Sequence, residues 1–220
     1  MAERDEVLGV ILAGGANRRF GSHKALARVG GETILERTIG ALASAVGRCV
    51  IVANEPDPYR DAGLETRPDL MPGFGVLGGI LTAVRWAEKE GQEAALVVGC
   101  DMPFLSPSLL LRLAQEADAA SVVVPASEGP RGFEPLCASY GTETGDAIRR
   151  SLDAGERAIV SFFDEVPVRI LDFETVRGFG DPASMFLNVN RPEDRDRAER
   201  FATRTPGNSP ESMDGHHEAI

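Results

Sequence analysis

VLGVILAGG, residues 7–15, decides the fold, because a short run of β-branched and aliphatic residues passes directly into a pair of glycines. Short apolar runs of this kind are typical of strands that are buried on both faces of a parallel sheet. The glycines end the strand, so the following loop lies at the carboxyl edge of the sheet, where open α/β folds bind their ligands. The stretch therefore predicts an α/β protein with a ligand site that begins near residue 12.

The pattern of this first strand repeats along the chain. Further apolar runs occupy 49–54, 94–100 and 121–126. Segments with helical periodicity occupy 33–46, 76–90 and 105–117. Strands that alternate with helices favour right-handed crossovers, so we predict a doubly wound, mostly parallel sheet with helices on both faces.

The second half of the chain has a looser rhythm. We expect strands at 135–140 and 166–173, a helix at 144–155, and a glycine-rich loop at 177–184. This half is expected to carry a small antiparallel edge and the region for a second substrate. A last helix is predicted to begin near residue 190, which gives one domain over residues 1–202 and a disordered tail over residues 203–220.

The composition excludes several classes of protein. The 220 residues carry a formal net charge of -11, which argues against a protein that follows nucleic-acid phosphates or lies on an anionic membrane. No apolar stretch reaches the length of a membrane span or has the features of a signal peptide. Three cysteines without a CxxC pair fit a reducing cytoplasm, with buried thiols as the expected role. We therefore expect a cytoplasmic protein without membrane or nucleic-acid partners.

The loop that follows the first strand is cationic, although the chain as a whole is acidic. No Asp or Glu occurs between residues 7 and 31, whereas the same segment holds Arg18, Arg19, Lys24 and Arg28. Gly14 and Gly15 allow backbone N–H groups to face phosphate oxygens, Arg19 can fork two of these oxygens, and Lys24 can act as a point charge. Neither GxxxxGK[ST] nor GxGxxG is present. The loop predicts a polyphosphate site, and a surface turn with solvated arginines is the alternative.

A carboxylate stands at the end of another predicted strand. In LVVGCDMPFL, Asp101 follows the apolar run and Pro103 prevents the strand from continuing. Mg²⁺ is usually held by one or two carboxylates together with substrate phosphates, so Asp101 is a candidate metal ligand. An Asp that caps the next turn is the alternative. The cation-rich loop and this carboxylate together are more specific than either of them alone.

Other polar residues are expected in loops at the same edge. Asn54 could pair with a base edge and Asp69 could accept from purine N–H groups, although turn formation explains both residues nearly as well. Four glycines in residues 73–79 suggest that the backbone comes close to a ligand here as well, with helix packing as the alternative explanation. Asn188 and Asn190 follow an apolar stretch, and Asn190 with Glu193 fits a helix cap, which is the role favoured by the sequence alone.

The complete set of motifs resembles the molybdenum cofactor guanylyltransferase family of nucleotidyltransferases. LAGGANRRFGSHKAL is similar to the signature LAGGxSxRMGxxKxL, CDMPFL to the metal-binding CDxPxL, and FLNVNRPED to the closing NVNTPEE. The resemblance covers nearly the whole chain up to the tail. This chain departs from the family pattern at three positions, where it has Asn17, Phe20 and Val76 instead of Ser, Met and the Pro of GPLGG.

The resemblance implies a fold and an activity. The family has a doubly wound α/β fold of the nucleotide-diphospho-sugar transferase type, and it transfers GMP from GTP to the phosphate of molybdopterin that carries molybdenum. It implies that Leu12, Ala13 and Gly14 contact the guanine nucleotide and that Lys24 contacts its phosphates. By the same resemblance Asn54 and Asp69 help to hold guanosine, Asp101 binds Mg²⁺, and Asn188 and Asn190 lie near the reacting phosphates or the pterin.

The resemblance also bears on the nucleotide and on rival functions. Related cytidylyltransferases read LAAG where this chain reads LAGG, so Gly14 favours GTP over CTP. The expected partners are GTP and Mo-molybdopterin as substrates, with transient contacts to molybdoenzymes or cofactor-handling proteins. The alternatives are a molybdopterin cytidylyltransferase, another nucleotidyltransferase of the same fold, and a non-catalytic nucleotide-binding protein.

Overall fold

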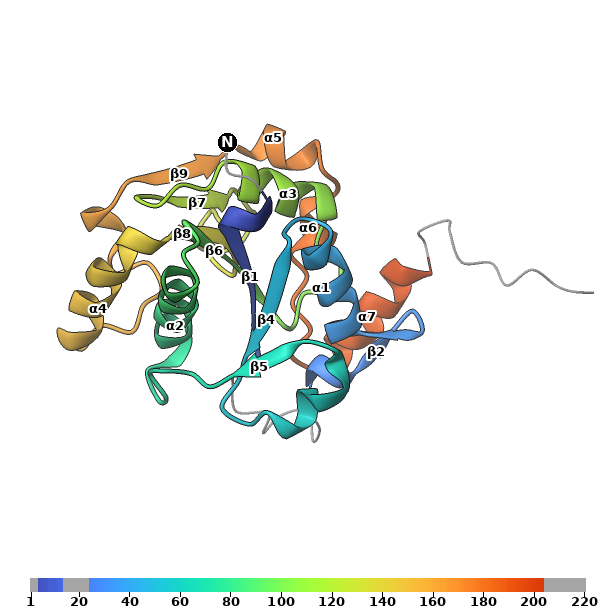
Figure 1. Cartoon of the computed structure of the whole chain (residues 1–220). Coiled ribbons are helices and arrows are strands. Elements are labelled where there is room, and N and C mark those ends of the chain that lie inside the picture. The colour runs from blue at the N-terminus through green and yellow to red at the C-terminus, as the bar shows by residue number, and fades with distance from the viewer. Residues whose placement is uncertain (1–3, 14–23, 204–220) are drawn as a thin grey trace, which may run out of the picture.

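A seven-stranded sheet forms the centre of the molecule (Figure 1). The computed structural model describes residues 4–13 and 24–203. The strand order is β5-β4-β1-β6-β8-β7-β9. The strands are β1 (Val7–Leu12), β4 (Arg48–Val52), β5 (Glu65–Arg67), β6 (Ala94–Gly99), β7 (Val122–Pro125), β8 (Cys137–Gly141) and β9 (Val168–Leu171). The predicted mostly parallel sheet is confirmed, whereas the predicted tail lies outside the described residues.

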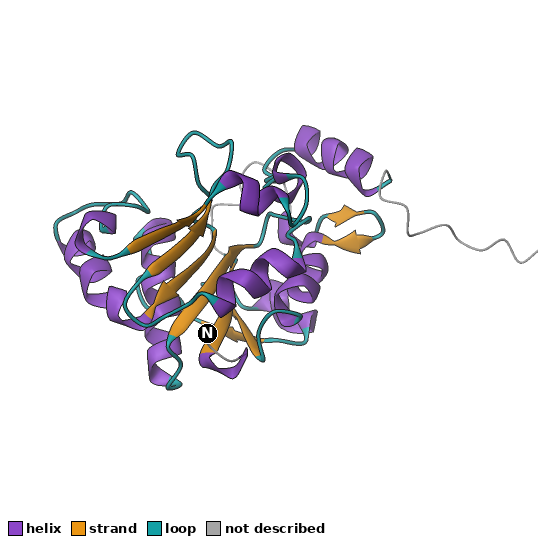
Figure 2. Ribbon diagram, turned by 90° about the horizontal axis from the view of Figure 1, so that it is seen from above, coloured by secondary structure: helices purple, strands orange, loops and turns teal. Residues whose placement is uncertain are grey.

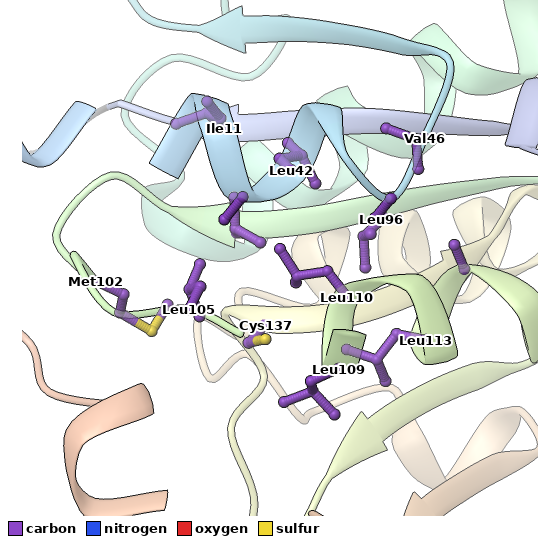
Figure 3. Close-up of a cluster of buried hydrophobic side chains, with 14 of the residues drawn as sticks. Ile11, Leu42, Val46, Leu96, Met102, Leu105, Leu109, Leu110, Leu113 and Cys137 are labelled. Atoms are coloured by element: carbon purple, nitrogen blue, oxygen red, sulfur yellow. The ribbon is translucent and has the colours of Figure 1, made fainter. Parts of the chain in front are cut away.

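Helices cover both faces of this sheet, as predicted (Figure 2). One face packs against α1 (Ile34–Ala43) and α3 (Pro107–Gln115), and the other against α2 (Gly75–Lys89) and α4 (Gly145–Asp153). Strand β1 alternates between the two cores, because Ile11 joins the first and Val10 the second. In the first core Ile11, Leu42, Leu96 and Leu110 converge (Figure 3). Burial on both faces explains why the strand has no polar side.

The antiparallel strand lies inside the sheet and not at its edge. β8 pairs with β6 on one side and with β7 on the other, and both pairings are antiparallel. All five residues of β8 are buried, so an edge position would have exposed an apolar strand to water. A separate antiparallel ribbon is formed by β2 (Arg28–Val29) and β3 (Glu32–Thr33).

Other short elements also differ from the sequence prediction. β5 was not expected, and the end of the predicted strand at 166–173 turns into α5 (Phe173–Arg177). The predicted loop at 177–184 contains most of α6 (Pro182–Met185), because the Asp181 carboxylate accepts hydrogen bonds from the backbone N–H groups of Ala183 and Ser184 at its start. The N-cap of α3 is Ser106 with Pro107 as the first helical residue, as predicted.

A third, smaller core joins the two ends of the described chain. The last helix, α7 (Pro192–Ala202), lies beside β2. The buried members of this third core are Val29, Ile34, Leu187, Val189 and Ala198. Beside them the rings of Phe104 and Phe201 meet edge to face, with 6.2 Å between the ring centroids. The segment that precedes α7 is thereby fixed near the start of the chain. Among the described residues, no helix is long and apolar enough to cross a membrane.

Candidate active site

The carboxyl ends of four parallel strands lie level with one another, and this register places their loops at one edge. Leu12 at the end of β1 pairs with Val52 of β4 on one side and with Gly99 of β6 on the other, while Val52 also pairs with Arg67 of β5. The loops that follow these strands carry Ala13, Asn54, Asp69 and Asp101. The sequence therefore placed these four residues at the correct edge of the sheet.

Lys24, Asp101 and Asn190 meet at this edge. The Lys24 ammonium donates to Oδ2 of Asp101 over 2.7 Å and to the Asn190 side-chain oxygen over 2.9 Å. The side chains of Lys24 and Asp101 are 22% and 12% exposed, so the pair is largely shielded from water. An ion pair in such a place is stronger than one on an open surface, although the desolvation of both charges opposes it. Residues far apart in the sequence thus form one charged cluster.

The backbone around Asp101 fixes the direction of its side chain. A Cβ at Gly99 would lie 2.8 Å from Oδ1 of Asp101, so a side chain at that position would displace the carboxylate from its present orientation. The Asp101 carbonyl accepts a hydrogen bond from the Val189 N–H at 2.9 Å, which attaches the segment before α7 to the end of β6. Met102, which follows, is fully buried. The carboxylate is consequently held at the strand end and faces Lys24.

Asn190 does not cap α7, and the sequence-based cap of Asn190 with Glu193 is wrong. The Asp194 carboxylate accepts from the backbone N–H groups of Asn190 and Arg191, at 3.0 and 2.8 Å, and satisfies the start of the helix. The Asn190 side chain is then free to receive Lys24. Asn188, two residues earlier, donates to the Phe186 carbonyl and has no contact of this kind with Lys24.

The other predicted ligand-binding residues have different environments. Ala13 is buried, and its carbonyl accepts a hydrogen bond from the Tyr59 hydroxyl at 3.2 Å. Leu12 is half-buried and packs against Gly79 of α2. Asn54 is exposed in a bend. Gly14, Gly15 and Arg19 lie outside the described residues, so their predicted roles remain predictions.

Asp69 is held by α2. Its Oδ1 accepts from the Thr82 hydroxyl at 2.6 Å and from the Met71 N–H at 2.8 Å. Thr82 is fully buried, and sequence reasoning missed it. The available signal was a lone hydroxyl in an otherwise apolar helical segment, since a buried polar group requires a partner.

Glu134 is a second carboxylate near Asp101 that sequence reasoning also missed. It precedes β8, whose antiparallel direction brings its start to the same edge of the sheet. Burial raises the pKa of Glu134, the Leu136 N–H lowers it through a hydrogen bond, and the negative charge of Asp101 raises it further. The signal in the sequence was weak, because the position of Glu134 depends on where β8 inserts.

The acidic oxygens of this edge suit a hard divalent cation. Among the described residues, no three His, Cys, Asp or Glu side chains are grouped to hold a metal by themselves. Oδ1 of Asp101 has no hydrogen-bond partner within the same residues, since Lys24 uses Oδ2. A single carboxylate oxygen completed by ligand phosphates is a usual way to bind Mg²⁺.

The three thiols of the chain are not suited to catalysis. Burial raises the pKa of Cys100 to about 12 and that of the half-buried Cys49 to about 11. Cys137 is fully buried, and its pKa is raised for the same reason. Thiols with raised pKa values are poor nucleophiles near neutral pH, so the expected role as buried apolar side chains holds best for Cys100 and Cys137.

Known proteins resemble this chain in sequence and in fold. Residues 9–168 match the MobA-like NTP transferase domain. A relative from Pelotomaculum thermopropionicum, named as a probable molybdenum cofactor guanylyltransferase, is 34% identical over 197 residues, which are 90% of this chain and 94% of the relative. The crystal structure of molybdopterin-guanine dinucleotide biosynthesis protein A from Archaeoglobus fulgidus superposes with a TM-score of 0.73 at 26% identity, and the match covers 89% of this chain and 98% of that one.

A more distant solved structure shares the fold. Rv0371C from Mycobacterium tuberculosis is 16% identical, with a TM-score of 0.61 and coverage of 89% of this chain and 98% of that one. It was determined in complex with manganese. A protein with this fold can therefore bind a divalent metal.

Proposed function

Because the chain belongs to the MobA-like NTP transferase family, we propose that it transfers GMP from GTP to the phosphate of Mo-molybdopterin and releases pyrophosphate. The observation that carries the proposal is the cluster of Lys24, Asp101 and Asn190 at the carboxyl edge of the sheet. It combines a cation for phosphate with a carboxylate for a divalent metal at one place. The names of the relatives indicate molybdopterin as the acceptor and guanine as the base.

The proposed reaction is a single in-line displacement. A phosphate oxygen of the pterin substrate forms a bond to the α-phosphorus of GTP, and the bond from that phosphorus to the bridging β-oxygen breaks. Pyrophosphate leaves with the electron pair of that bond. Such transfers depend on positioning and on neutralisation of charge more than on covalent participation by the protein.

Each proposed role belongs to a residue of this edge. Lys24 exchanges its contact with Asp101 for the phosphates and offsets the charge of the departing pyrophosphate, and Asn190 holds the ammonium in place. Asp101, through its carboxylate, would hold Mg²⁺, which supplies Lewis-acid neutralisation of the phosphates when bound. Arg19, in the segment outside the described residues, is proposed to add a second cation. Asn54 and Asp69 are proposed to hold guanosine.

A nucleotide panel tests the proposed function. The purified protein is incubated with Mg²⁺, Mo-molybdopterin and GTP, CTP or ATP, and the release of pyrophosphate is measured. We expect release with GTP that requires the acceptor. Equal turnover of CTP and GTP would contradict the assignment of the base. Tight binding of GTP without release of pyrophosphate would favour a non-catalytic binding protein. Release of pyrophosphate with a sugar phosphate but not with the pterin would show that the acceptor is a sugar phosphate.

A further inference from the structure

Thr82 lies inside the molecule with its hydroxyl turned to the proposed guanosine residue, Asp69. The side chain is fully buried on α2, and the hydroxyl lies 2.6 Å from Oδ1 of Asp69. The same hydroxyl oxygen accepts a hydrogen bond from the Leu70 N–H at 3.0 Å. Because a hydroxyl has one proton, and Asp69 as a carboxylate can only accept, that proton is committed to Asp69.

These contacts fix one oxygen of the carboxylate and leave the other available. Oδ1 of Asp69 accepts from both Thr82 and the Met71 N–H. Within the described part of the chain, Oδ2 has no hydrogen-bond partner, and the residue is only half-buried. A carboxylate that is held by two donors on one oxygen cannot rotate freely about its last bond. Its second oxygen therefore points in a fixed direction.

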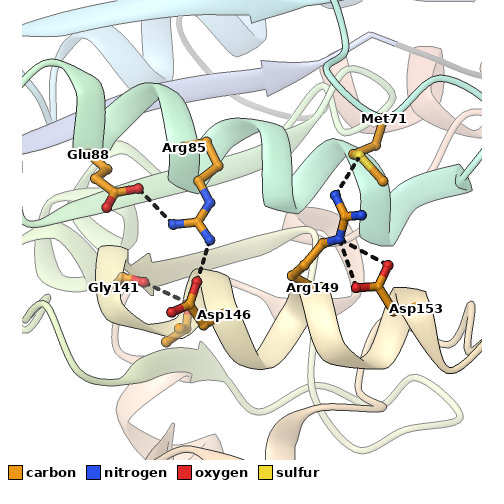
Figure 4. A network of polar contacts seen from close by, with 8 residues as sticks. Met71, Arg85, Glu88, Gly141, Asp146, Arg149 and Asp153 are labelled. Carbon is orange, nitrogen blue, oxygen red and sulfur yellow. Dashed lines mark hydrogen bonds and ion pairs between the residues drawn. The ribbon is translucent and has the colours of Figure 1, made fainter.

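The loop that carries Asp69 is itself supported on both sides. A Cβ at Gly78 of α2 would lie 3.0 Å from the Met71 carbonyl oxygen, so helix and loop are in close contact. From α4, the Arg149 guanidinium reaches the Met71 sulfur at 3.8 Å and also pairs with Asp153 (Figure 4). Arg157 covers the ring of Phe74 at 4.5 Å. The direction of the Asp69 carboxylate is therefore set by the packed core and not by a free loop.

We propose that Thr82 is a positioning residue that directs the second oxygen of Asp69 to the N–H edge of guanine and so determines the preference for GTP. This inference rests on the proposed function. Guanine carries two donors on that edge, the N1–H and the 2-amino group, whereas adenine presents a lone pair at N1. A fixed carboxylate oxygen attracts the first base and repels the second. Sites built around such polar pairs discriminate strongly, because the wrong base leaves a buried group unpaired.

Equilibrium binding in the presence of Mg²⁺ tests this role. The affinities of GTP and ATP are measured by titration calorimetry for the wild type, Thr82→Val and Thr82→Ser. We expect Thr82→Val to weaken GTP binding by about tenfold, as for the loss of one hydrogen bond to a charged group, and not to weaken ATP binding. Thr82→Ser keeps the hydroxyl and should bind GTP like the wild type.

Two controls separate positioning from a general loss of packing. Thr144 is also fully buried and donates to the Gly141 carbonyl, at the opposite edge of the sheet, so Thr144→Val should leave both affinities unchanged. In an Asp69→Ala background, Thr82→Val should weaken GTP binding no further, because the carboxylate that Thr82 orients is gone. If Thr82→Val does not fold, as judged by thermal unfolding, Thr82→Ala gives the same comparison.

The outcomes distinguish the two levels of the proposal. A wild type without preference for GTP would contradict the proposed function itself. A wild type that prefers GTP, together with a Thr82→Val protein of equal preference, would overturn only the positioning role. The positioning role is likewise overturned if Thr82→Val weakens GTP and ATP binding equally, or if its effect persists after Asp69 is removed.

Discussion

Lys24 and Asp101 neutralise each other in a partly shielded place, and this pairing makes their substitution informative. Asp101→Asn removes the charge that is proposed to hold the metal, and Lys24→Ala removes the cation that is proposed to face the phosphates. We expect either change to lower the rate of pyrophosphate release by about 100-fold or more, as for other lost electrostatic contacts in transfer reactions. The thermal unfolding transition should remain cooperative in both proteins.

An exposed ion pair supplies the control for this prediction. Glu174 and Arg177 pair on α5 with side chains that are 84% and 60% exposed. Surface pairs of this kind contribute little to stability, so Glu174→Gln and Arg177→Ala should leave both activity and unfolding unchanged. Near-normal turnover in both site variants would refute the roles proposed for Lys24 and Asp101.

Gly99 controls the same carboxylate from two positions earlier in the chain. In Gly99→Ala, the added Cβ would lie 2.8 Å from Oδ1 of Asp101, so the carboxylate must turn away. We expect a fall in turnover with little change in far-UV circular dichroism. Gly40→Ala is the matched control, because nothing lies within 4 Å of its Cβ, and alanine in an exposed helix should stabilise the fold by about 0.5–1 kcal/mol. Full activity of Gly99→Ala would show that Asp101 tolerates another orientation.

At this scale, the sequence was a good guide to charge and a poor guide to contacts. Lys24 and Asp101 could be singled out, because Lys24 lies in a cationic segment without acidic residues and Asp101 directly follows an apolar strand. The role of Asn190 could not, since Asp194 and Glu193 both suit the first turn of α7 and only the folded chain shows which side chain reaches back. Thr82 and Glu134 were missed because their partners come from other elements.

Helix α1 begins with a reciprocal cap whose strength depends on pH. Thr33 accepts from the Glu36 N–H, while the Glu36 carboxylate accepts from the Thr33 backbone and hydroxyl. The Thr33 backbone hydrogen bond, followed by that of its hydroxyl, lowers the pKa of Glu36. A carboxylate with a lowered folded-state pKa stabilises the protein above its unfolded pKa, and this contribution is lost as the pH falls through the folded value.

Glu36→Gln should therefore destabilise the protein only where the carboxylate is charged. We expect a lower urea midpoint than that of the wild type near pH 7, and no difference once the pH has fallen below the lowered folded-state pKa, where Glu36 is protonated in both states. Urea unfolding at several pH values provides the measurement. A difference that is constant across this range would assign the effect to shape and not to charge.

Elements with a clear apolar period could be predicted, and those held by polar contacts could not. β5 has the sequence Glu65-Thr66-Arg67, which does not look like a strand. It is stabilised by Arg67, which is buried, pairs with Glu65 and Glu90, and lies 4.6 Å over the ring of Trp86. The position of β8 was also beyond prediction, because its insertion between β6 and β7 depends on non-local pairing.

At the scale of the whole molecule, α7 and the segment before it complete the site at the carboxyl edge of the sheet, to which the loop after β1 also belongs. The Gly30 N–H of the β2–β3 ribbon donates to Glu199 of α7 at 3.1 Å, and the third core lies beneath that contact. Val189, within this core, also donates its N–H to the Asp101 carbonyl. The position of Asn190 beside Lys24 therefore depends on the packing of the last helix against the rest of the protein.

The ion pair between Lys24 and Asp101 also means that the two opposite charges of the site neutralise each other before any ligand binds. A lone phosphate meets a cation that is already engaged, and a lone metal ion meets a carboxylate that is already neutralised. The metal–nucleotide complex replaces both partners at once, so the two ligands should favour each other's binding by thermodynamic linkage. Without nucleotide, Lys24→Ala should accordingly bind Mn²⁺ about tenfold more tightly than the wild type, as measured by electron paramagnetic resonance. Equal or weaker binding by Lys24→Ala would mean that the ion pair does not restrain the carboxylate. Tighter binding would mean that Lys24 disfavours binding of the metal in the absence of nucleotide.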